Sequence, residues 1–265
     1  MLSFFRGCWE WKSQVFHLAK IDLVKTCRGA VLGWIWLFVR PATYVFVFWL
    51  ALALGLKAGS TVGDYPYIVW LTAGLIPWFF MQELISTGSD VYRRYTYLVN
   101  KIKFPLVAIS AFYALSKLYI YLMSMGIFML GCIIFGYHFS IYLIQLPFVF
   151  ALMYGFFVAW SVMTSPLSAI SKDFGNLIKT LSTPLFWLSG IIFNLGTIHH
   201  EWVHTVMCFN PVSFFVEAHR YAMCDNMWLW ENPKMLLIFL VVFLATIIVA
   251  RIVFRRLNTE VADVL

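Results

Sequence analysis

The sequence predicts an all-α integral membrane protein with six transmembrane helices. Of its 265 residues, 62% are hydrophobic and only 12% are charged. The apolar residues form six long blocks, each able to supply the roughly 20 residues that cross a bilayer as a helix. The alternating ten-residue segments typical of membrane β-barrels are missing. The predicted spans, within a single domain of residues 1–265, are 31–56, 66–88, 105–135, 142–169, 178–198 and 235–254.

The basic residues predict the orientation of these spans. Fourteen of the 19 Lys and Arg residues fall in gaps, or at the span ends next to them, on one side of the predicted membrane, and three fall on the other. Positive residues remain on the cytoplasmic side, so both termini are predicted to be cytoplasmic. The net charge of +7 is therefore a topology signal. We expect membrane lipids as partners, and no nucleic acid.

Residues 1–28 precede the first span and predict an amphipathic helix at the inner membrane interface. Charged residues interrupt this segment, which lacks the apolar core of a cleavable signal peptide. Apolar residues recur at three- and four-residue spacing, as on one helix face: Phe4, Phe5, Cys8, Trp9, Val15, Phe16, Ala19 and Leu23. A solvated helix packing on another subunit is the alternative.

The inner gap from Ser89 to Phe104 is basic, aromatic and compatible with a helix that stops before Pro105. A turn between two spans needs only a few residues. This longer segment therefore predicts a docking element for a cytoplasmic partner. A basic loop resting on anionic lipid head groups is the alternative.

The outer gap, 199–234, is apolar but broken at Asn210-Pro211, and neither part is long enough to cross the membrane. This pattern predicts re-entrant or interfacial helices. Its aromatic residues predict a belt at the outer leaflet or an exit path for a sugar chain: Trp202, Phe209, Phe214, Phe215, Tyr221, Trp228 and Trp230. Cys208 and Cys224 lie on this side, and the sequence leaves their pairing open.

One enzyme motif is present in this gap. His200-Glu201-Trp202-Val203-His204 matches H-E-x-x-H, in which two His residues on one helix face bind zinc. The extended motif is missing, and the candidate third ligands Glu217 and His219 lie beyond Pro211. We therefore predict no metal site and no catalytic residues, and keep a membrane zinc protease as a distant alternative.

Ionisable residues within spans are candidate functional residues. Arg40, Glu83 and Lys117 qualify, and a pairing of Lys117 with Glu83 would form a structural bridge. The sequence has no phosphate-binding P-loop and no chain of carboxylates within the spans. It therefore indicates a transport subunit whose energy comes from another chain.

Five stretches, in order, resemble the membrane subunits of type-2 ATP-binding-cassette exporters for cell-surface polysaccharides. They are LAKIDLVKTCRGAVLGWIWLFVRP (18–41), TAGLIPWFF (72–80), LVNKIKFP (98–105), KDFGNLIKTLSTPLFWLSGIIF (172–193) and NPVSFFVEAHRYAM (210–223). WLWENP and VFRRLNTEVADVL most resemble the wall teichoic acid exporters, while O-antigen and capsule exporters share most of the other landmarks. Residues 187–190 depart from the Ser-Pro-x-x-Tyr/Trp of many relatives.

The resemblance implies a homodimer that works with two copies of a cytoplasmic P-loop ATPase. That ATPase would bind ATP and Mg, so this chain needs no cofactor. The substrate would be a polyprenyl-diphosphate-linked glycopolymer, exported across the bacterial cytoplasmic membrane through a channel between the two subunits. Residues 90–103 would form the coupling helix, and residues 199–234 the outer gate region.

The resemblance also implies site residues. The expected ATPase contacts are Tyr92, Arg93, Arg94, Tyr95 and Lys101; the channel or substrate contacts are Trp34, Trp36, Arg40, Trp49 and Trp187; the outer-gate residues are Asn210, Pro211, Phe214, Phe215 and Arg220. Each tryptophan has the alternative of packing as span core or lipid anchor. Arg40 has the alternative of reaching the inner interface.

Overall fold

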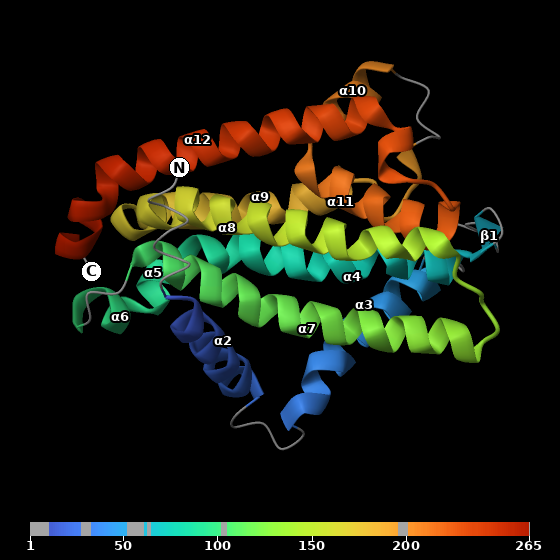
Figure 1. Cartoon of the computed structure of the whole chain (residues 1–265), viewed down its shortest axis with the longest axis horizontal. Coiled ribbons are helices and arrows are strands. Elements are labelled where there is room, and N and C mark those ends of the chain that lie inside the picture. Colours follow the sequence, from blue (N-terminus) through green and yellow to red (C-terminus); the bar gives the residue numbers. More distant parts are fainter. Residues whose placement is uncertain are drawn as a thin grey trace.

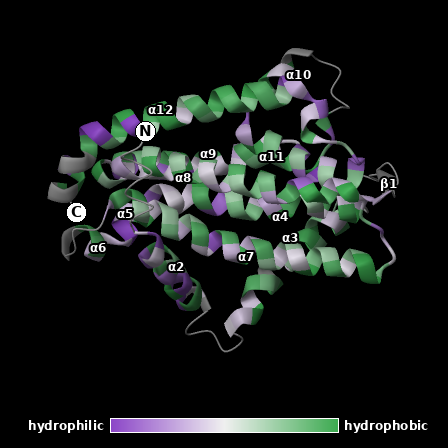
Figure 2. Ribbon diagram, viewed as in Figure 1, coloured by the Kyte–Doolittle hydropathy of each residue, from purple (hydrophilic) through white to green (hydrophobic). Residues whose placement is uncertain are grey.

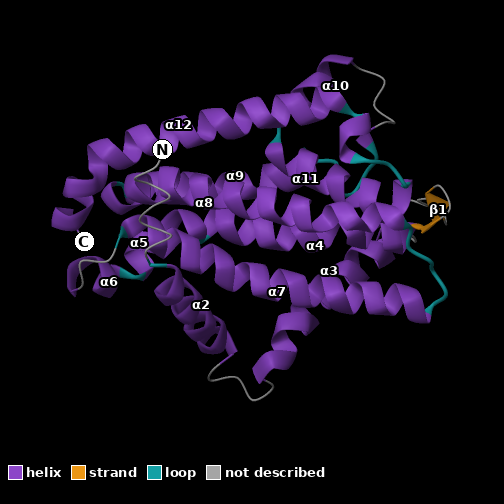
Figure 3. Cartoon of the chain, in the orientation of Figure 1, coloured by secondary structure: helices purple, strands orange, loops and turns teal. Residues whose placement is uncertain are grey.

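The protein is a bundle of long helices (Figure 1). The computed structural model describes residues 11–27, 33–51, 61–62, 65–101, 105–195 and 201–264. In this part of the chain, five helices are long and apolar enough to cross a membrane, which confirms the all-α membrane fold. The strands described are a short antiparallel hairpin, β1 (Thr61–Val62) and β2 (Tyr65–Pro66). Helices account for almost all of the ribbon in Figure 3.

Five predicted spans have matching helices. They are α3 (Trp36–Leu50, after a 3₁₀ turn at Gly33–Ile35), α4 (Tyr67–Ser86), α7 (Leu106–Ile134), α8 (Leu146–Ile170, after a 3₁₀ turn at Ile141–Gln145) and α12 (Pro233–Val264). Pro147 and Pro233 lie in first turns, where the missing N–H costs nothing. Hydrophobic residues, coloured green, make up much of the ribbon of these helices in Figure 2. The short helices α5 (Val91–Arg94) and α6 (Thr96–Lys101) lie at one end of the bundle, and β1 lies at the other.

The fifth span differs from the prediction of a helix over 178–198. Helix α9 runs from Lys172 to Trp187, and turns follow it to residue 195. Sixteen residues span about 24 Å, less than the roughly 30 Å hydrocarbon core. The Ser171 hydroxyl accepts a hydrogen bond from the Phe174 amide and caps the early start. Gly190, with φ of +68°, provides the left-handed turn after the helix.

The outer gap contains short helices, as expected. They are α10 (Glu201–Cys208), α11 (Pro211–Arg220), a π-helical turn (Tyr221–Asp225) and a 3₁₀ turn (Leu229–Glu231). Asn210 caps α11, because its side-chain oxygen accepts from the Val212 amide at 3.0 Å, and Pro211 takes the first helical position. Helix α11 packs against α4, α8 and α12.

Two of the predicted gate residues lie in the bundle core. The Phe214 ring stacks on the Phe239 ring of α12, with centroids 3.9 Å apart. The Phe215 ring lies edge-to-face against the Phe156 ring of α8 at 6.1 Å. Such aromatic contacts stabilise helix packing beyond the area that they bury. In this structure Phe214 and Phe215 therefore attach α11 to its neighbours and do not line an open gate.

Helix α2 (Lys12–Cys27) packs on α7 and diverges from the bundle (Figure 1). Its buried face contains Val15, Ala19 and Asp22. Phe16, expected on the apolar face, is 52% exposed and does not pack into the bundle. Residues 1–10 and 28 of the predicted interfacial helix lie outside the described residues.

Candidate functional site

A buried carboxylate joins α2 to the bundle. The Oδ1 atom of Asp22 accepts a hydrogen bond from the Tyr95 hydroxyl, and its Oδ2 atom accepts one from Ser116 Oγ at 2.6 Å. The Nζ atom of Lys117 lies 3.9 Å from the same Oδ2. Asp22 is only 4% exposed, so its charge depends on these three partners.

The same lysine reaches a second carboxylate. Lys117 Nζ lies 3.7 Å from Glu83 Oε1, which confirms the predicted pair. The Tyr113 hydroxyl donates to that oxygen at 2.5 Å, and the Tyr113 ring lies 4.9 Å from Nζ. We call this six-residue network, which joins α2, α4, α7 and the Tyr95 turn, the charged junction: Asp22, Glu83, Tyr95, Tyr113, Ser116 and Lys117.

Two predicted ATPase contacts face inward. Tyr92 is fully buried and Tyr95 is 5% exposed, so neither side chain can meet a partner chain in this conformation. Burial and the hydrogen bond to Asp22 raise the pKa of Tyr95. The reason is local: the predicted coupling helix, 90–103, is split at Tyr95 into α5 and α6, and Tyr95 turns toward Asp22. Residues 102 and 103 lie outside the described part.

The segment Gly88–Lys101, here called the coupling segment, is fixed to two further helices. The Gly88 carbonyl accepts hydrogen bonds from Ser161 and Ser165 of α8 at 2.7 and 2.9 Å. Asp90 pairs with Lys179 of α9. Tension on this segment would therefore reach α8 and α9 directly.

The two predicted arginines of the segment have different environments. Arg93 Nη2 donates to the Ala169 carbonyl near the C-terminus of α8 at 2.9 Å. This hydrogen bond leaves fewer guanidinium donors of Arg93 for a partner chain. Arg94 is exposed, with its guanidinium 5.7 Å from the Tyr113 ring. Tyr97, which sequence reasoning did not select, is 46% exposed. Lys101 ends α6, and its side chain lies outside the described residues.

A second polar network holds the turn after α9. Arg220 is fully buried; Nη1 donates to the Gly190 carbonyl at 2.7 Å and Nη2 to the Ile191 carbonyl at 2.6 Å. Nη1 also pairs with Glu217 at 3.0 Å, and the guanidinium carbon lies 3.3 Å from the Trp70 ring centroid. The predicted gate residue Arg220 thus anchors α11 to the turn and to α4.

Two more residues hold the same turn. Asn210 Nδ2 donates to Ser189 Oγ at 2.8 Å, and the Tyr67 hydroxyl of α4 donates to the Ile192 carbonyl at 2.9 Å. Space for the guanidinium comes from Gly74, where a Cβ atom would lie 2.9 Å from Arg220 Nη2. We call Tyr67, Trp70, Asn210, Glu217 and Arg220 the turn clasp. Its contacts satisfy the carbonyls of Gly190, Ile191 and Ile192 in the turn that follows α9.

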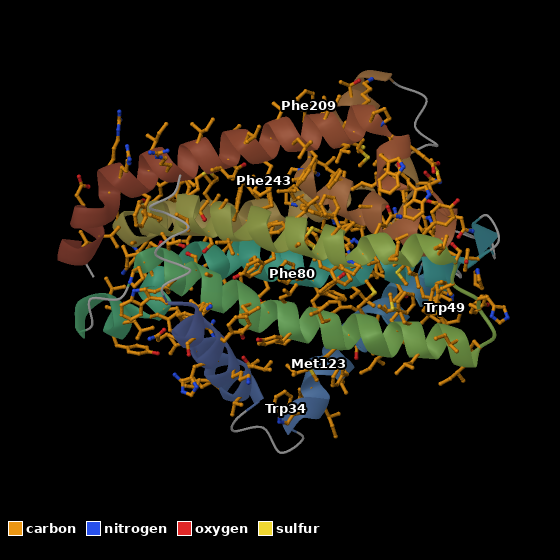
Figure 4. All side chains as sticks on the ribbon, in the orientation of Figure 1. Trp34, Trp49, Phe80, Met123, Phe209 and Phe243 are labelled. Atoms are coloured by element: carbon orange, nitrogen blue, oxygen red, sulfur yellow. The ribbon has the colours of Figure 1, made fainter. Side chains whose placement is uncertain are left out.

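The predicted channel tryptophans lie on α3, on its leading turn and on α9. Trp34, Trp36 and Trp187 are 43%, 41% and 53% exposed, and Trp49 is half-buried beside Phe46. Figure 4 shows Trp34 and Trp49 toward opposite ends of this first span. The side chain of Arg40 in α3 lies outside the described residues.

Helix α9 also carries a polar stripe, of which sequence reasoning selected only Trp187. Asn176, Thr180, Thr183 and Trp187 are exposed at i, i+4, i+7 and i+11, the spacing of one helix face. On the other side of α9, Phe186 contacts Phe48 of α3 and Trp78 of α4, with ring centroids 5.2 and 5.4 Å apart. The Thr180 hydroxyl donates to the Asn176 carbonyl within the helix at 2.9 Å. The exposed side-chain amide of Asn176 would be costly in lipid, which favours contact of this stripe with water, substrate or another subunit.

The zinc motif gains no support from the described residues. Among them no group of three His, Cys, Asp or Glu residues could hold a metal ion. His200 and the side chains of Glu201 and His204 lie outside the described part. Of the candidate third ligands, Glu217 pairs with Arg220, and both nitrogens of His219 have partners at 2.6 Å, Phe215 O and the Tyr121 hydroxyl. Cys208 and Cys224 are not joined by a disulfide.

Comparison with known proteins adds a family and a relative. A family model described as ABC-2 type transporter matches residues 13–224, from α2 into the π-helical turn. The chain is also similar to the O-antigen export system permease protein RfbA of Myxococcus xanthus. The two sequences are 19% identical over 238 residues, 89% of this chain and 90% of the relative. The matched region includes both the charged junction and the turn clasp.

Proposed function

Because the chain belongs to the ABC-2 type transporter family, we propose that it is the transmembrane subunit of an ATP-driven exporter for a cell-surface glycopolymer. It is a multi-pass membrane protein and a transport subunit. In the proposed assembly, two copies of this chain enclose the channel. Two copies of a cytoplasmic P-loop ATPase bind ATP and Mg and hydrolyse the nucleotide.

The observation that carries this proposal is the open face of α3 and α9. The polar stripe of α9 ends at Trp187, and Trp34 and Trp36 are exposed at the beginning of the first span. A sugar polymer offers hydroxyls to Asn and Thr side chains and flat ring faces to aromatic rings. Two such faces in a homodimer would line one continuous path, which a polymer longer than any closed cavity requires.

In this proposal the end of the bundle that holds α5 and α6 faces the cytoplasm. The protein lies in the bacterial cytoplasmic membrane. Both chain termini are on the cytoplasmic side, as the distribution of basic residues predicts. Among the side chains of the coupling segment that the structure describes, Arg94 and Tyr97 are exposed and would meet the ATPase. Motion there would reach α8 and α9 through Gly88, Asp90 and their partners.

The polymer itself is a matter of prediction. Wall teichoic acid linked to polyprenyl diphosphate remains our predicted substrate, on the resemblance of WLWENP and the C-terminal stretch. An O-antigen or capsular polysaccharide is the alternative, and the name of the Myxococcus relative supports it. The chain can be expressed in host strains that lack either their teichoic acid permease or their O-antigen permease, each together with the ATPase that is found bound to this chain. Export in one host and not in the other would identify the polymer class.

Composition of the native complex tests the assembly. We expect native mass spectrometry of gently solubilised material to find two copies of this chain with two copies of a P-loop ATPase. Metal analysis of the same sample is expected to find no stoichiometric zinc. A chain with one zinc and no ATPase would overturn the proposal in favour of a membrane protease.

Charge reversal at the exposed arginine tests the coupling contact. We expect Arg94→Glu to lower transport and permease-coupled ATP hydrolysis at least tenfold, because Arg94 is an exposed cation of the coupling segment. Arg255→Glu, an equally exposed arginine on α12, is the matched control. Normal coupling in Arg94→Glu, or an equal loss in Arg255→Glu, would contradict this assignment.

A further inference from the structure

Two hollows lie between α3, α4 and α7 and adjoin at Pro41, Ile76 and Ser124, which line both. One has a volume of about 620 Å³ and an almost wholly apolar lining that includes Phe38, Val45, Ile127, Gly131 and Phe135. The other has a volume of about 430 Å³ and a mixed lining that includes Thr26, Trp36, Gln82, Glu83 and Lys117. Together they form one amphipathic groove, here called the α3–α7 groove.

The polar part of the groove contains both signs of charge. Lys117 is 7% exposed, and its Nζ atom lies 3.7 Å from Glu83 Oε1 and 3.9 Å from Asp22 Oδ2. Both separations exceed the roughly 3.2 Å limit of a good N–H···O hydrogen bond. The ammonium group can therefore still donate to a ligand oxygen. Glu83 is partly exposed and can accept from a ligand N–H.

These charges select among lipid head groups. Among the described residues that line the groove, Glu83 and Lys117 are charged and their charges cancel, so the site has no excess positive charge to hold a diphosphate or another strongly anionic head. A zwitterionic head places its phosphate on Lys117 and its ammonium on Glu83. A primary ammonium donates hydrogen bonds that a quaternary one cannot.

The depth of the groove fits a lipid. Lys117 and Gly131 are about 21 Å apart along α7, which exceeds half of the roughly 30 Å hydrocarbon core. Glu83 lies near the end of α4 that leads into the coupling segment, so the charged part of the groove lies toward the membrane surface and the apolar part extends inward.

We propose that the α3–α7 groove binds one zwitterionic phospholipid with a primary ammonium head group, of the phosphatidylethanolamine type, and borders the polymer path at Trp36, which lines the groove. The head group lies between Glu83 and Lys117, and an acyl chain fills the apolar hollow. This site goes beyond the proposed export function, since it would exist whichever polymer is moved.

The test uses a pair of glycines on one helix. A Cβ atom at Gly131 or at Gly126 meets nothing within 4 Å, but only Gly131 lines the groove. The full chain is reconstituted in vesicles of equal parts phosphatidylethanolamine, phosphatidylcholine and phosphatidylglycerol, gently extracted and analysed by native mass spectrometry. We expect about one phosphatidylethanolamine per chain in the native protein and in Gly126→Phe, and at least a tenfold loss in Gly131→Phe.

Two further variants keep the test sharp. Ala42→Phe fills the groove from α3, so it must also lose the lipid if Gly131→Phe fails to fold. Glu83→Gln must reduce the preference for phosphatidylethanolamine over phosphatidylcholine at least fivefold, because the ammonium loses its charged partner. Retention of phosphatidylglycerol, equal retention in all variants, or no retained lipid would overturn the proposal. So would a lipid-linked glycan bound there in protein from the native host.

Discussion

Replacing Arg220 with methionine is expected to destabilise the protein by about 3–5 kcal/mol, because the change leaves Glu217 without its buried partner charge. It also removes both donors from the Gly190 and Ile191 carbonyls, which lie 2.7 and 2.6 Å from the guanidinium. Such a loss is a large part of the total stability of most proteins. Thermal unfolding in detergent, followed by the loss of monodisperse protein, measures the effect.

Matched variants separate a structural role from a gating role. Arg220→Met combined with Glu217→Leu is expected to recover part of the stability, since an apolar pair often replaces a buried ion pair without loss. Arg220→Lys keeps the positive charge, but an ammonium group lacks the planar pair of donors that reaches both the Gly190 and the Ile191 carbonyl. The stability of this variant should therefore fall between that of Arg220→Met and that of the native protein. A stable Arg220→Lys protein without transport would instead support the predicted gate function. If Arg220→Met were as stable as the native protein, the stabilising role of the turn clasp would be contradicted.

The long helices could be predicted from the sequence because length and hydropathy alone decide whether a segment crosses a bilayer. The fifth span was harder to place. Helix α9 begins with Lys172 and Asp173, outside the predicted apolar block, and ends where Gly190 turns the chain. That end depends on Arg220, thirty positions away, so no local pattern could reveal it.

The charged junction was predictable in part. A lysine within a span requires a nearby acid, and this rule gives the Lys117–Glu83 pair. Asp22 was missed, although it continues the face of Val15 and Ala19 at helical spacing. An acid on the buried face of a helix indicates a buried partner, but the partner's identity depends on contacts across 73 and 94 positions. Tyr95 was assigned to the ATPase because its sequence neighbours do not reveal its buried position. That position depends on the hydrogen bond to Asp22, which is distant in the sequence.

Asp22→Asn is expected to uncouple the transporter. The asparagine side chain still fills the space and its oxygen still accepts from Ser116, so the stability loss should stay at about 1–3 kcal/mol. Lys117 loses one of its two carboxylates, and the Tyr95 hydroxyl loses its charged acceptor. The coupling segment is then held less firmly to α2 and α7. We expect ATP hydrolysis to continue while transport per ATP falls at least tenfold in reconstituted vesicles.

Controls decide whether Asp22 transmits motion or only supports the fold. Glu260→Gln, the same loss of charge at an exposed position on α12, should leave transport per ATP unchanged. In a double-mutant cycle with Lys117→Gln, the effects of the two changes on transport per ATP should not add, because the two side chains act through one ion pair. Transport and hydrolysis that fall together with protein yield would assign Asp22 to stability alone. Unchanged transport per ATP in a stably folded Asp22→Asn protein would exclude the charged junction from coupling. The link between ATPase and channel would then run through Gly88 and Asp90 to α8 and α9.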